Sequence, residues 1–120
     1  MHQQSKIICL CGLQIEIMTY KVRISAGSEE EAKKISNKLI EEELVAGTLI
    51  TSGESRYHWQ GSIDHQEYYN IQAYSLGELK QKIIDQVELM HSDDVPIIEF
   101  IEVDGNQKLI EWVRNSVTLQ

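Results

Sequence analysis

The sequence has one proline, two cysteines and no long apolar run, and each shortage excludes a class of protein. One proline and seven glycines in 120 residues leave no flexible linker, so the chain indicates a single globular domain. No apolar run approaches the roughly 20 residues of a membrane-spanning helix, so we expect no membrane partner. The rest of the composition, 42% hydrophobic and 25% charged, is typical of a domain with a packed core.

Positive charge is also scarce. Eleven Lys and Arg residues stand against nineteen Asp and Glu residues, which gives a net charge of −8. A nucleic-acid surface needs clustered cations to contact phosphates. We therefore expect no nucleic-acid partner.

The two cysteines, Cys9 and Cys11, are too close together for a useful structural disulfide. This predicts a reducing compartment, and we expect a cytoplasmic location. A C-x-C pair suits a soft metal such as copper(I), although two thiolates without further ligands make a weak site. A soft-metal pair and two ordinary apolar thiols both stay open as interpretations.

Residues 1–17 are the least informative part of the chain. Their short apolar run lacks the small-x-small cleavage pattern of a signal peptide. Three interpretations stay open: a peripheral or poorly ordered extension, a translated upstream stretch before a start at Met18, or an added edge strand. We assign residues 1–17 to an N-terminal extension and residues 18–120 to the domain.

The domain opens with a strand and a helix. Residues 20–25 alternate apolar and polar side chains, which predicts a strand with one buried face. Residues 28–31 predict a capping box, in which the Ser28 hydroxyl accepts from the amide of Glu31 and the Glu31 carboxylate reaches back. Apolar residues at spacings of three and four then predict a helix to about Leu44.

An aromatic-rich hairpin follows. Tyr57 and Trp59 are two apart, so on a strand both rings project from one face. Residues 60–62 supply a reversal, and residues 63–74 predict the second strand. Upstream, residues 45–52 predict a strand that enters the hairpin through a bend or bulge at Gly53, with Gly47 as an interruption.

The second half of the domain again combines a capped helix with a strand, followed by a terminal helix. Ser75-x-x-Glu78 predicts another capping box and a helix that ends near His91. Residues 95–103 predict a strand, and residues 107–117 predict a terminal helix that buries three apolar residues, Ile110, Val113 and Val117.

These elements predict an α+β fold: a ferredoxin-like βαββαβ sandwich with a long central hairpin and a C-terminal helix. Both main helices should cover one face of an antiparallel sheet. The other face carries aromatic and aliphatic residues, and open apolar surface of this kind predicts an oligomer.

His91, Asp93 and Asp94 form the best candidate metal cluster. One imidazole and two carboxylates suit a divalent ion such as copper(II) or zinc. The alternative is a polar cap at the end of a helix. His58 and His65, near facing positions on the hairpin, are a second candidate pair, with ordinary solvated histidines as the alternative.

Tyr57 and Trp59 either line a ligand cleft or fill an interface between subunits. Glu67 is placed to pair with Arg56 across the strands. Because we find no nucleophile motif and no Gly-rich phosphate loop, we predict that the chain is not an enzyme. A His91–Asp94 acid–base pair is the catalytic alternative.

From Met18 to about Val113 these pieces resemble the CutA family, the divalent-cation tolerance proteins. The matching pieces, in the family's order, are S-x-E-E-A at 28–32, the acidic end at 39–44, Ser55-x-Tyr57-x-Trp59-x-Gly61-x-Ile63, Glu67, His91, Val95-Pro96 and Trp112.

The resemblance implies a homotrimer whose sheets pack through the long hairpins, similar to the PII signalling proteins with their clefts between subunits. It implies a non-enzymatic role in divalent-ion tolerance, with copper or zinc as the metal. The cleft or interface positions are Arg56, Tyr57, Trp59, Glu67, Gln72 and Trp112. The alternative function is a PII-like trimer that binds a small anion or nucleotide in the cleft.

The chain departs from the family pattern at cleft positions. Where the family has A-A-C-V-N-I, residues 45–50 put Gly47 in place of the cysteine and Leu49 in place of the asparagine. The family lysine after the hairpin is Gln72, and the loop at 91–97 lacks the family's tyrosine and second glutamate. We therefore expect weakened metal affinity.

Overall fold

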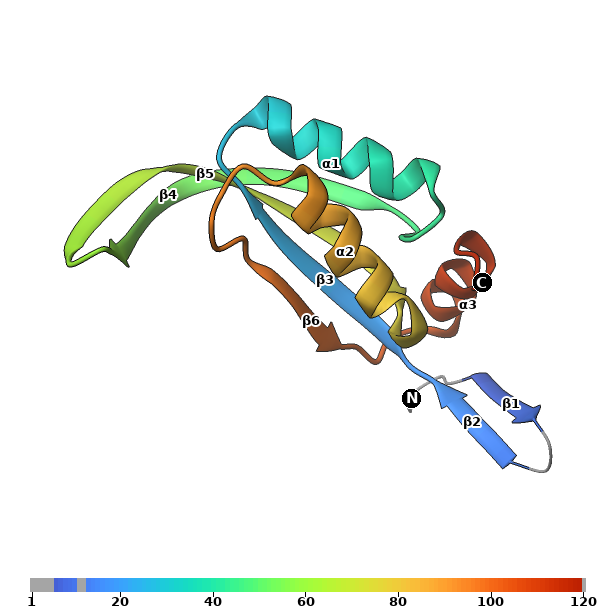
Figure 1. Cartoon of the computed structure of the whole chain (residues 1–120). Helices are drawn as coiled ribbons and strands as arrows, with labels where there is room; N and C mark the ends of the chain where they lie inside the picture. The colour runs from blue at the N-terminus through green and yellow to red at the C-terminus, as the bar shows by residue number, and fades with distance from the viewer. Residues whose placement is uncertain (1–5, 11–12, 120) are drawn as a thin grey trace.

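The computed structural model describes the backbone of residues 6–10 and 13–119 and the side chains of residues 18–119. In chain order (Figure 1) the elements are β1 (Lys6–Leu10), β2 (Leu13–Ile17), β3 (Thr19–Ala26), α1 (Glu29–Glu41), β4 (Thr48–Trp59), β5 (Ser62–Leu76), the 3-10 turn η1 (Gly77–Leu79), α2 (Lys80–Met90), β6 (Ile98–Glu102) and α3 (Gln107–Ser116). Within these described residues, no helix has the length and apolarity that a membrane crossing requires.

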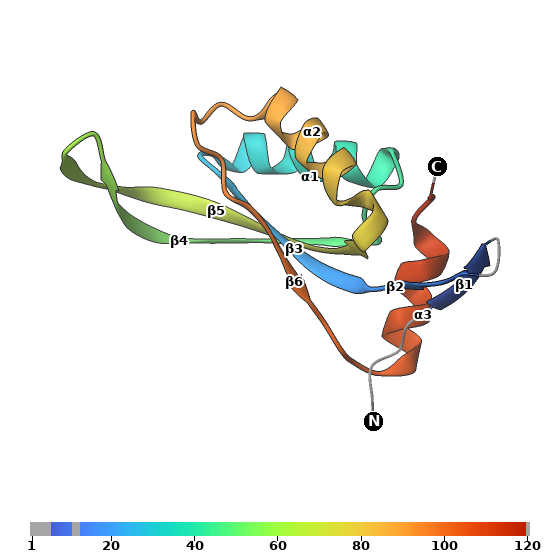
Figure 2. The same cartoon turned by 60° about the horizontal axis from the view of Figure 1, so that its bottom comes forward.

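A four-stranded sheet organises the domain. Its strand order is β4-β5-β3-β6, and every neighbouring pair is antiparallel. Helices α1 and α2 lie side by side on one face of this sheet (Figure 2). The predicted α+β, ferredoxin-like βαββαβ architecture with a C-terminal helix is confirmed.

The core lies between this sheet face and the two helices. Alternate residues of β3, Val22 and Ile24, are fully buried, as the period-two pattern predicted. The α1 stripe supplies Ile35 and Leu39 from above them. The remaining buried apolar members are Ala26, Ala32, Leu44, Val45, Ile71, Ala73, Leu76, Leu79, Ile83, Val87, Val113 and Val117.

Helix α1 begins as predicted and ends early. The Ser28 hydroxyl accepts from the Glu31 amide at 3.1 Å. The helix ends at Glu41 and not near Leu44, because Glu43 takes a left-handed conformation with φ 57°. The Leu44 amide then donates to the Leu39 carbonyl at 3.0 Å, a helix-ending motif that turns Leu44 back into the core.

The central hairpin is more regular than predicted. Its register runs without a break from the Thr48–Ala73 pair to the Trp59–Ser62 pair, so the bulge predicted at Gly53 is absent. Strand β4 starts at Thr48, after Gly47, and not at residue 45. Gln60 (φ 49°) and Gly61 (φ 83°) form the reversal, a two-residue turn with positive φ at both positions.

Two further predictions on the second half were wrong. Ser75 does not cap a helix: it lies in β5, fully buried, and its hydroxyl donates to the Leu44 carbonyl at 2.6 Å. Helix α2 is instead entered through η1 without a side-chain cap. Strand β6 covers only residues 98–102 of the predicted 95–103, because residues 92–97 form a loop. The terminal helix buries Ile110 and Val113 as predicted.

Strands β1 and β2 pair with each other as a separate two-stranded sheet. In the part of the chain that the structure describes, neither strand joins the edge of the main sheet. The interpretation of residues 1–17 as an added edge strand of that sheet was therefore wrong. The assignment of residues 1–17 as a peripheral extension stays a prediction.

The molecule is elongated because two hairpins project from it (Figure 1). Its extents are 53 × 30 × 26 Å, and its radius of gyration is 15.9 Å. A compact domain of this length would have a radius of gyration of about 14 Å. The β4–β5 hairpin extends beyond α1 and α2, so no helix among the described residues covers either face of its far half.

Candidate functional site

The face of the sheet opposite α1 and α2 carries the aromatic residues. Ile50 of β4 pairs with the buried Ile71 on the helix-covered face. Tyr57 and Trp59 are an odd number of residues further along the same strand, so they lie on the open face. The prediction that both rings share one face is confirmed by this register.

A groove of about 760 Å³ opens on this face between the hairpin and the 92–97 loop. Its lining includes the aromatic residues Tyr57, Trp59, Tyr68 and Tyr69 and the carboxylates of Glu54, Asp93 and Asp94. The other lining residues are Arg23, Ser25, Gly53, Ser55, His58, Gln66, Asn70, Ser92, Val95 and Ile97. This volume lies within the usual range for small-molecule sites.

The aromatic wall of the groove is held by specific contacts. The rings of Tyr57 and Tyr68 meet edge to face, with centroids 5.9 Å apart and an angle of 82° between planes. The Tyr57 hydroxyl donates to Gln66 Oε1 at 3.3 Å, and the Tyr68 hydroxyl donates to Asp93 Oδ2 at 2.8 Å. Burial, and then the Asp93 carboxylate, raise the pKa of Tyr68, so its hydroxyl stays a donor to the loop.

The 92–97 loop is tied to α1 and β3 at both ends. Glu31 accepts from the Gly27 amide through Oε1 at 3.0 Å and from the Ser92 amide through Oε2 at 2.7 Å. At the far end, the Ile97 amide donates to Ser25 Oγ at 3.2 Å. The Glu31 carboxylate therefore reaches back along the chain as predicted, to the Gly27 amide, and it also accepts from the Ser92 amide of the loop.

Burial alone would raise the pKa of Glu31, since it disfavours the charged carboxylate. The amide hydrogen bonds from Gly27 and Ser92 favour the charged form and outweigh burial, so the pKa of Glu31 is lowered. The ionised form of Glu31 therefore stabilises the loop.

His91 is also part of this anchor. Its side chain is 1% exposed, and Nε2 lies 2.5 Å from the Ser25 carbonyl oxygen. Nδ1 accepts from the Asp93 amide at 3.0 Å, so Nε2 is the donor nitrogen. Both ring nitrogens are thus engaged in backbone hydrogen bonds, and neither offers a free lone pair to a metal.

The donor set for the expected copper or zinc ion does not fit this arrangement. Asp93 accepts from Tyr68, while Asp94 is exposed. Across the described residues, no three His, Cys, Asp or Glu side chains come together in a way that would hold a metal ion. Cys11 lies outside the described residues and the side chain of Cys9 is not described, so the C-x-C pair stays a prediction.

Of the other predicted residues, His58 lines the groove, whereas Arg56 and Gln72 lie outside its lining. Arg56 forms its ion pair with Glu54 at 3.6 Å, and not with Glu67 as predicted, because the register puts Glu67 opposite Glu54. Arg56 itself faces His65, and His58 faces Ile63, so the two histidines are diagonal neighbours. Gln72 lies between Arg23 and Leu49 in the sheet.

Trp112 lies on α3 and packs on Gly47. A Cβ at Gly47 would come within 2.7 Å of Trp112 Cη2. The ring therefore occupies the space of any side chain at position 47, which gives a packing reason for glycine there. The Trp112 ring is still half exposed.

Sequence reasoning missed Tyr68, Asn70 and the loop-anchoring role of Glu31. Counting pairs outward from the turn at Gly61 would have found Tyr68, since it pairs with Gly53 on the same face as Tyr57. The contact between Glu31 and Ser92 joins residues 61 apart, and no local pattern predicts it.

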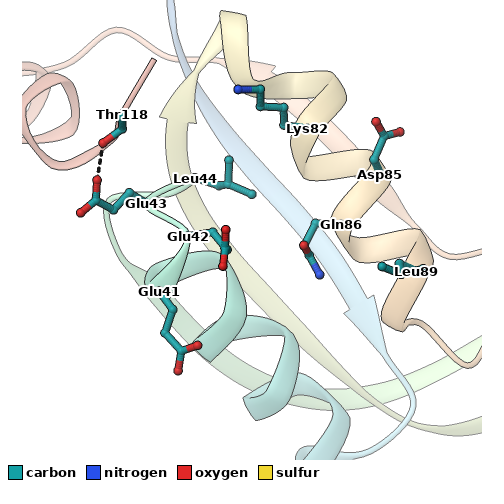
Figure 3. Close-up of a pocket in the computed structure, with 9 residues that line it drawn as sticks. All are labelled: Glu41, Glu42, Glu43, Leu44, Lys82, Asp85, Gln86, Leu89 and Thr118. Carbon is teal, nitrogen blue, oxygen red and sulfur yellow. Dashed lines mark hydrogen bonds between the residues drawn. The ribbon is translucent and has the colours of Figure 1, made fainter. Parts of the chain in front are cut away.

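A second hollow, of about 540 Å³, lies between the end of α1, helix α2 and the C-terminal segment (Figure 3). Glu41, Glu42 and Glu43 line one side of it, and Asp85 and Lys82 line the other. The Thr118 hydroxyl bonds to the Glu43 carboxylate there, and its amide donates to the Glu43 carbonyl. These contacts fasten the C-terminal segment to the end of α1.

The model of the family described as CutA1 divalent ion tolerance protein matches residues 20–116. The divalent-cation tolerance protein CutA of Thermus thermophilus is 30% identical over 97 residues, which cover 79% of this chain and 94% of the relative. The chloroplastic protein CutA of Arabidopsis thaliana is 29% identical over 97 residues, and there the match covers 79% of this chain. The chain spans about half, 53%, of the length of that plant relative.

Among solved structures, the chain is similar to the periplasmic divalent cation tolerance protein CutA from Archaeoglobus fulgidus. The TM-score is 0.81 at 28% identity, covering 84% of this chain and 100% of that chain. The likeness therefore extends over the whole βαββαβ domain.

Glu31→Gln should lower the free energy of unfolding near pH 7 by about 1–3 kcal/mol, because an amide oxygen cannot serve both N–H donors as the carboxylate does. Since the pKa of Glu31 is lowered from 4.5, its contribution is fully present above that value and is lost as the pH falls through the folded-state pKa. Urea unfolding of both proteins as a function of pH measures this.

The difference between the two proteins should therefore be constant near neutral pH and should shrink below about pH 4. Glu30→Gln, at an exposed position in the same turn, is the matched control and should change stability by less than about 0.5 kcal/mol. A pH-independent difference for Glu31→Gln would contradict the role given to its charge.

Proposed function

The chain belongs to the CutA1 divalent ion tolerance family, and from this premise we propose that it acts in divalent-cation tolerance as a non-enzymatic homotrimer. The family match supports the role, since the relatives are named divalent-cation tolerance proteins. The open face of the sheet and the projecting hairpin support the proposal of a homotrimer. A cytoplasmic location stays a prediction from the two thiols, because the relatives include a chloroplastic and a periplasmic protein.

The main support for the trimer is a set of apolar side chains that are exposed to solvent in the single chain. Leu49 on β4 is 60% exposed, Ile63 on β5 is 69% exposed, and Ile101 on β6 is 50% exposed. By register, Leu49 and Ile101 lie on the open face with Tyr57 and Trp59. A two-stranded hairpin of this length is marginal in water unless another surface packs on it. Sister chains that pack their hairpins and sheets together would supply that surface.

The small-anion alternative receives less support from the groove. Arg23 is paired with Glu99 at 2.5 Å, and Asp93 and Asp94 add negative charge to the lining. Arg56, a position of the cleft that the resemblance implies, lies with Ile50 on the other face of β4. An anion would therefore meet carboxylates rather than free guanidinium groups.

The role does not require a metal ion held by one chain. His91 serves as a loop anchor, and binding an ion through it would break a hydrogen bond to the Asp93 amide or to the Ser25 carbonyl. The proposal for His91, Asp93 and Asp94 is accordingly structural: they hold the loop that borders the groove. Non-enzymatic action is proposed on the same ground, since the His91–Asp94 acid–base pair would need the ring nitrogens that are already in use.

Purified protein should have the molar mass of three chains by light scattering at micromolar concentration. Trp59→Ala should shift the population toward single chains, because truncating a buried aromatic side chain costs about 3–5 kcal/mol. Leu89→Ala is the matched control: Leu89 is 83% exposed on α2, which covers the other face of the sheet, and its variant should stay trimeric. A wild-type monomer, or a Trp59→Ala variant that assembles as tightly as wild type, would contradict the interface.

Expression of the chain in a bacterial strain that lacks its own family member should restore growth in copper-containing medium. Trp59→Ala should restore growth less well and Leu89→Ala fully, with expression of each checked by immunoblot. Failure of well-expressed wild-type chain to restore growth would contradict the tolerance role while leaving the trimer standing.

A further inference from the structure

The loop at 92–97 carries apolar surface of its own. Val95 is 67% exposed and Ile97 is 43% exposed in the single chain. Both residues line the groove whose other wall holds Tyr57 and Trp59. The apolar surface that supports the homotrimer therefore continues across the groove onto the loop.

Ile97 also continues the open face of the main sheet. The Ser25 amide donates to the Ile97 carbonyl at 3.1 Å, which extends the pairing of β3 with β6 by one residue. Ile97 and Ile101 are four positions apart along this extended segment, so they share a face. A sister chain that covers Ile101 would therefore also meet the loop.

The residues that hold the loop lie mostly away from this surface. Ser25 contacts both ends of the loop, since its carbonyl bonds to His91 Nε2 and its hydroxyl accepts from the Ile97 amide. The Glu31 carboxylate accepts from the Ser92 amide at 2.7 Å. Glu31 belongs to α1, on the face of the sheet that the helices cover (Figure 2), and its side chain is only 14% exposed. A sister chain on the open face would therefore not contact Glu31.

The anchoring of the loop affects what assembly costs. A loop that becomes ordered only when a partner binds loses conformational entropy at that moment, and the affinity falls accordingly. Here the hydrogen bonds to Ser92, Asp93 and Ile97 all come from the same chain. The loop is therefore already in one conformation before a sister chain arrives.

We propose that the loop at 92–97 is a second contact surface between copies of this chain, and that Glu31 is a positioning residue for assembly. Glu31 acts through the Ser92 amide, and the loop that it holds presents Val95 and Ile97 to the neighbouring chain. This inference rests on the proposed homotrimer. It goes beyond that proposal because it assigns control of the interface to a carboxylate on the opposite side of the sheet.

Val95→Asp tests the contact surface. The exposed position should accept the substitution without unfolding the single chain. A charge buried between chains should raise the protein concentration at which half of the chains are assembled by at least about tenfold. Light scattering over a dilution series measures this concentration.

Leu89→Asp is the matched control for Val95→Asp, because it makes the same change of charge at an 83% exposed apolar residue of α2. It should assemble as wild type. Unchanged assembly of Val95→Asp, or equal weakening by both substitutions, would overturn the contact surface.

Glu31→Gln tests the positioning role. It should raise the half-assembly concentration about tenfold, because the loop loses a charge-assisted hydrogen bond while no contact between chains is removed. Ser28→Ala is the matched control: it removes the cap of the same helix and so also destabilises the chain, but Ser28 Oγ bonds to Glu31 N and not to the loop.

Ser28→Ala should therefore assemble as wild type at a temperature where circular dichroism shows each variant folded. Equal weakening by Glu31→Gln and Ser28→Ala would indicate a general effect of stability and would overturn the positioning role. Wild-type assembly of Glu31→Gln would overturn it as well.

The mass of the wild-type protein separates this inference from the homotrimer. A trimeric wild type that both Val95→Asp and Glu31→Gln weaken supports both proposals. A trimeric wild type that neither substitution weakens would overturn the role of the loop and leave the homotrimer standing. A monomeric wild type would overturn both.

Discussion

The unbroken register of β4 and β5 is the constraint on which the rest of the structure depends. Pairing from Thr48 to Trp59 carries the hairpin beyond the two helices that cover the sheet. Within the core, this register places Ile71 and Ala73 under the helices. Beyond the core, the same alternation turns Tyr57 and Trp59 to the opposite face. A one-residue slip would exchange the two faces, so core packing and the aromatic groove are fixed by one pairing.

The loop at 92–97 depends on a second, smaller set of contacts. The carboxylate of Glu31 joins the start of α1 to the Ser92 amide, and His91 joins the end of α2 to β3. Both side chains hydrogen-bond to backbone groups in this fold. The histidine that suggested a metal ligand in the sequence is thus an anchor for one wall of the groove.

The sequence was sufficient for most of the fold, because the signals were local. Alternating apolar and polar residues predicted β3, the Ser28 cap predicted the start of α1, and the turn at Gly61 predicted the hairpin. Prediction from the sequence failed where tertiary contacts override local sequence preferences. Ser75 has the spacing of a helix cap, yet its hydroxyl is used by the Leu44 carbonyl in the core. Of the groove lining, Tyr57, His58, Trp59, Asp93 and Asp94 were among the predicted candidates. The contact between Glu31 and Ser92 was not predictable, because these residues meet only in the folded chain.

Amide hydrogen exchange along residues 54–67 tests most directly the central claim, that sister chains cover the projecting hairpin. In the part of the chain that the structure describes, no helix shields this segment, so protection beyond that of the hairpin's own hydrogen bonds must come from assembly. The account predicts that these amides exchange nearly as slowly as those of β3 in the wild-type protein, and rapidly in Trp59→Ala. Rapid exchange of residues 54–67 in wild-type protein whose β3 amides remain protected would contradict it.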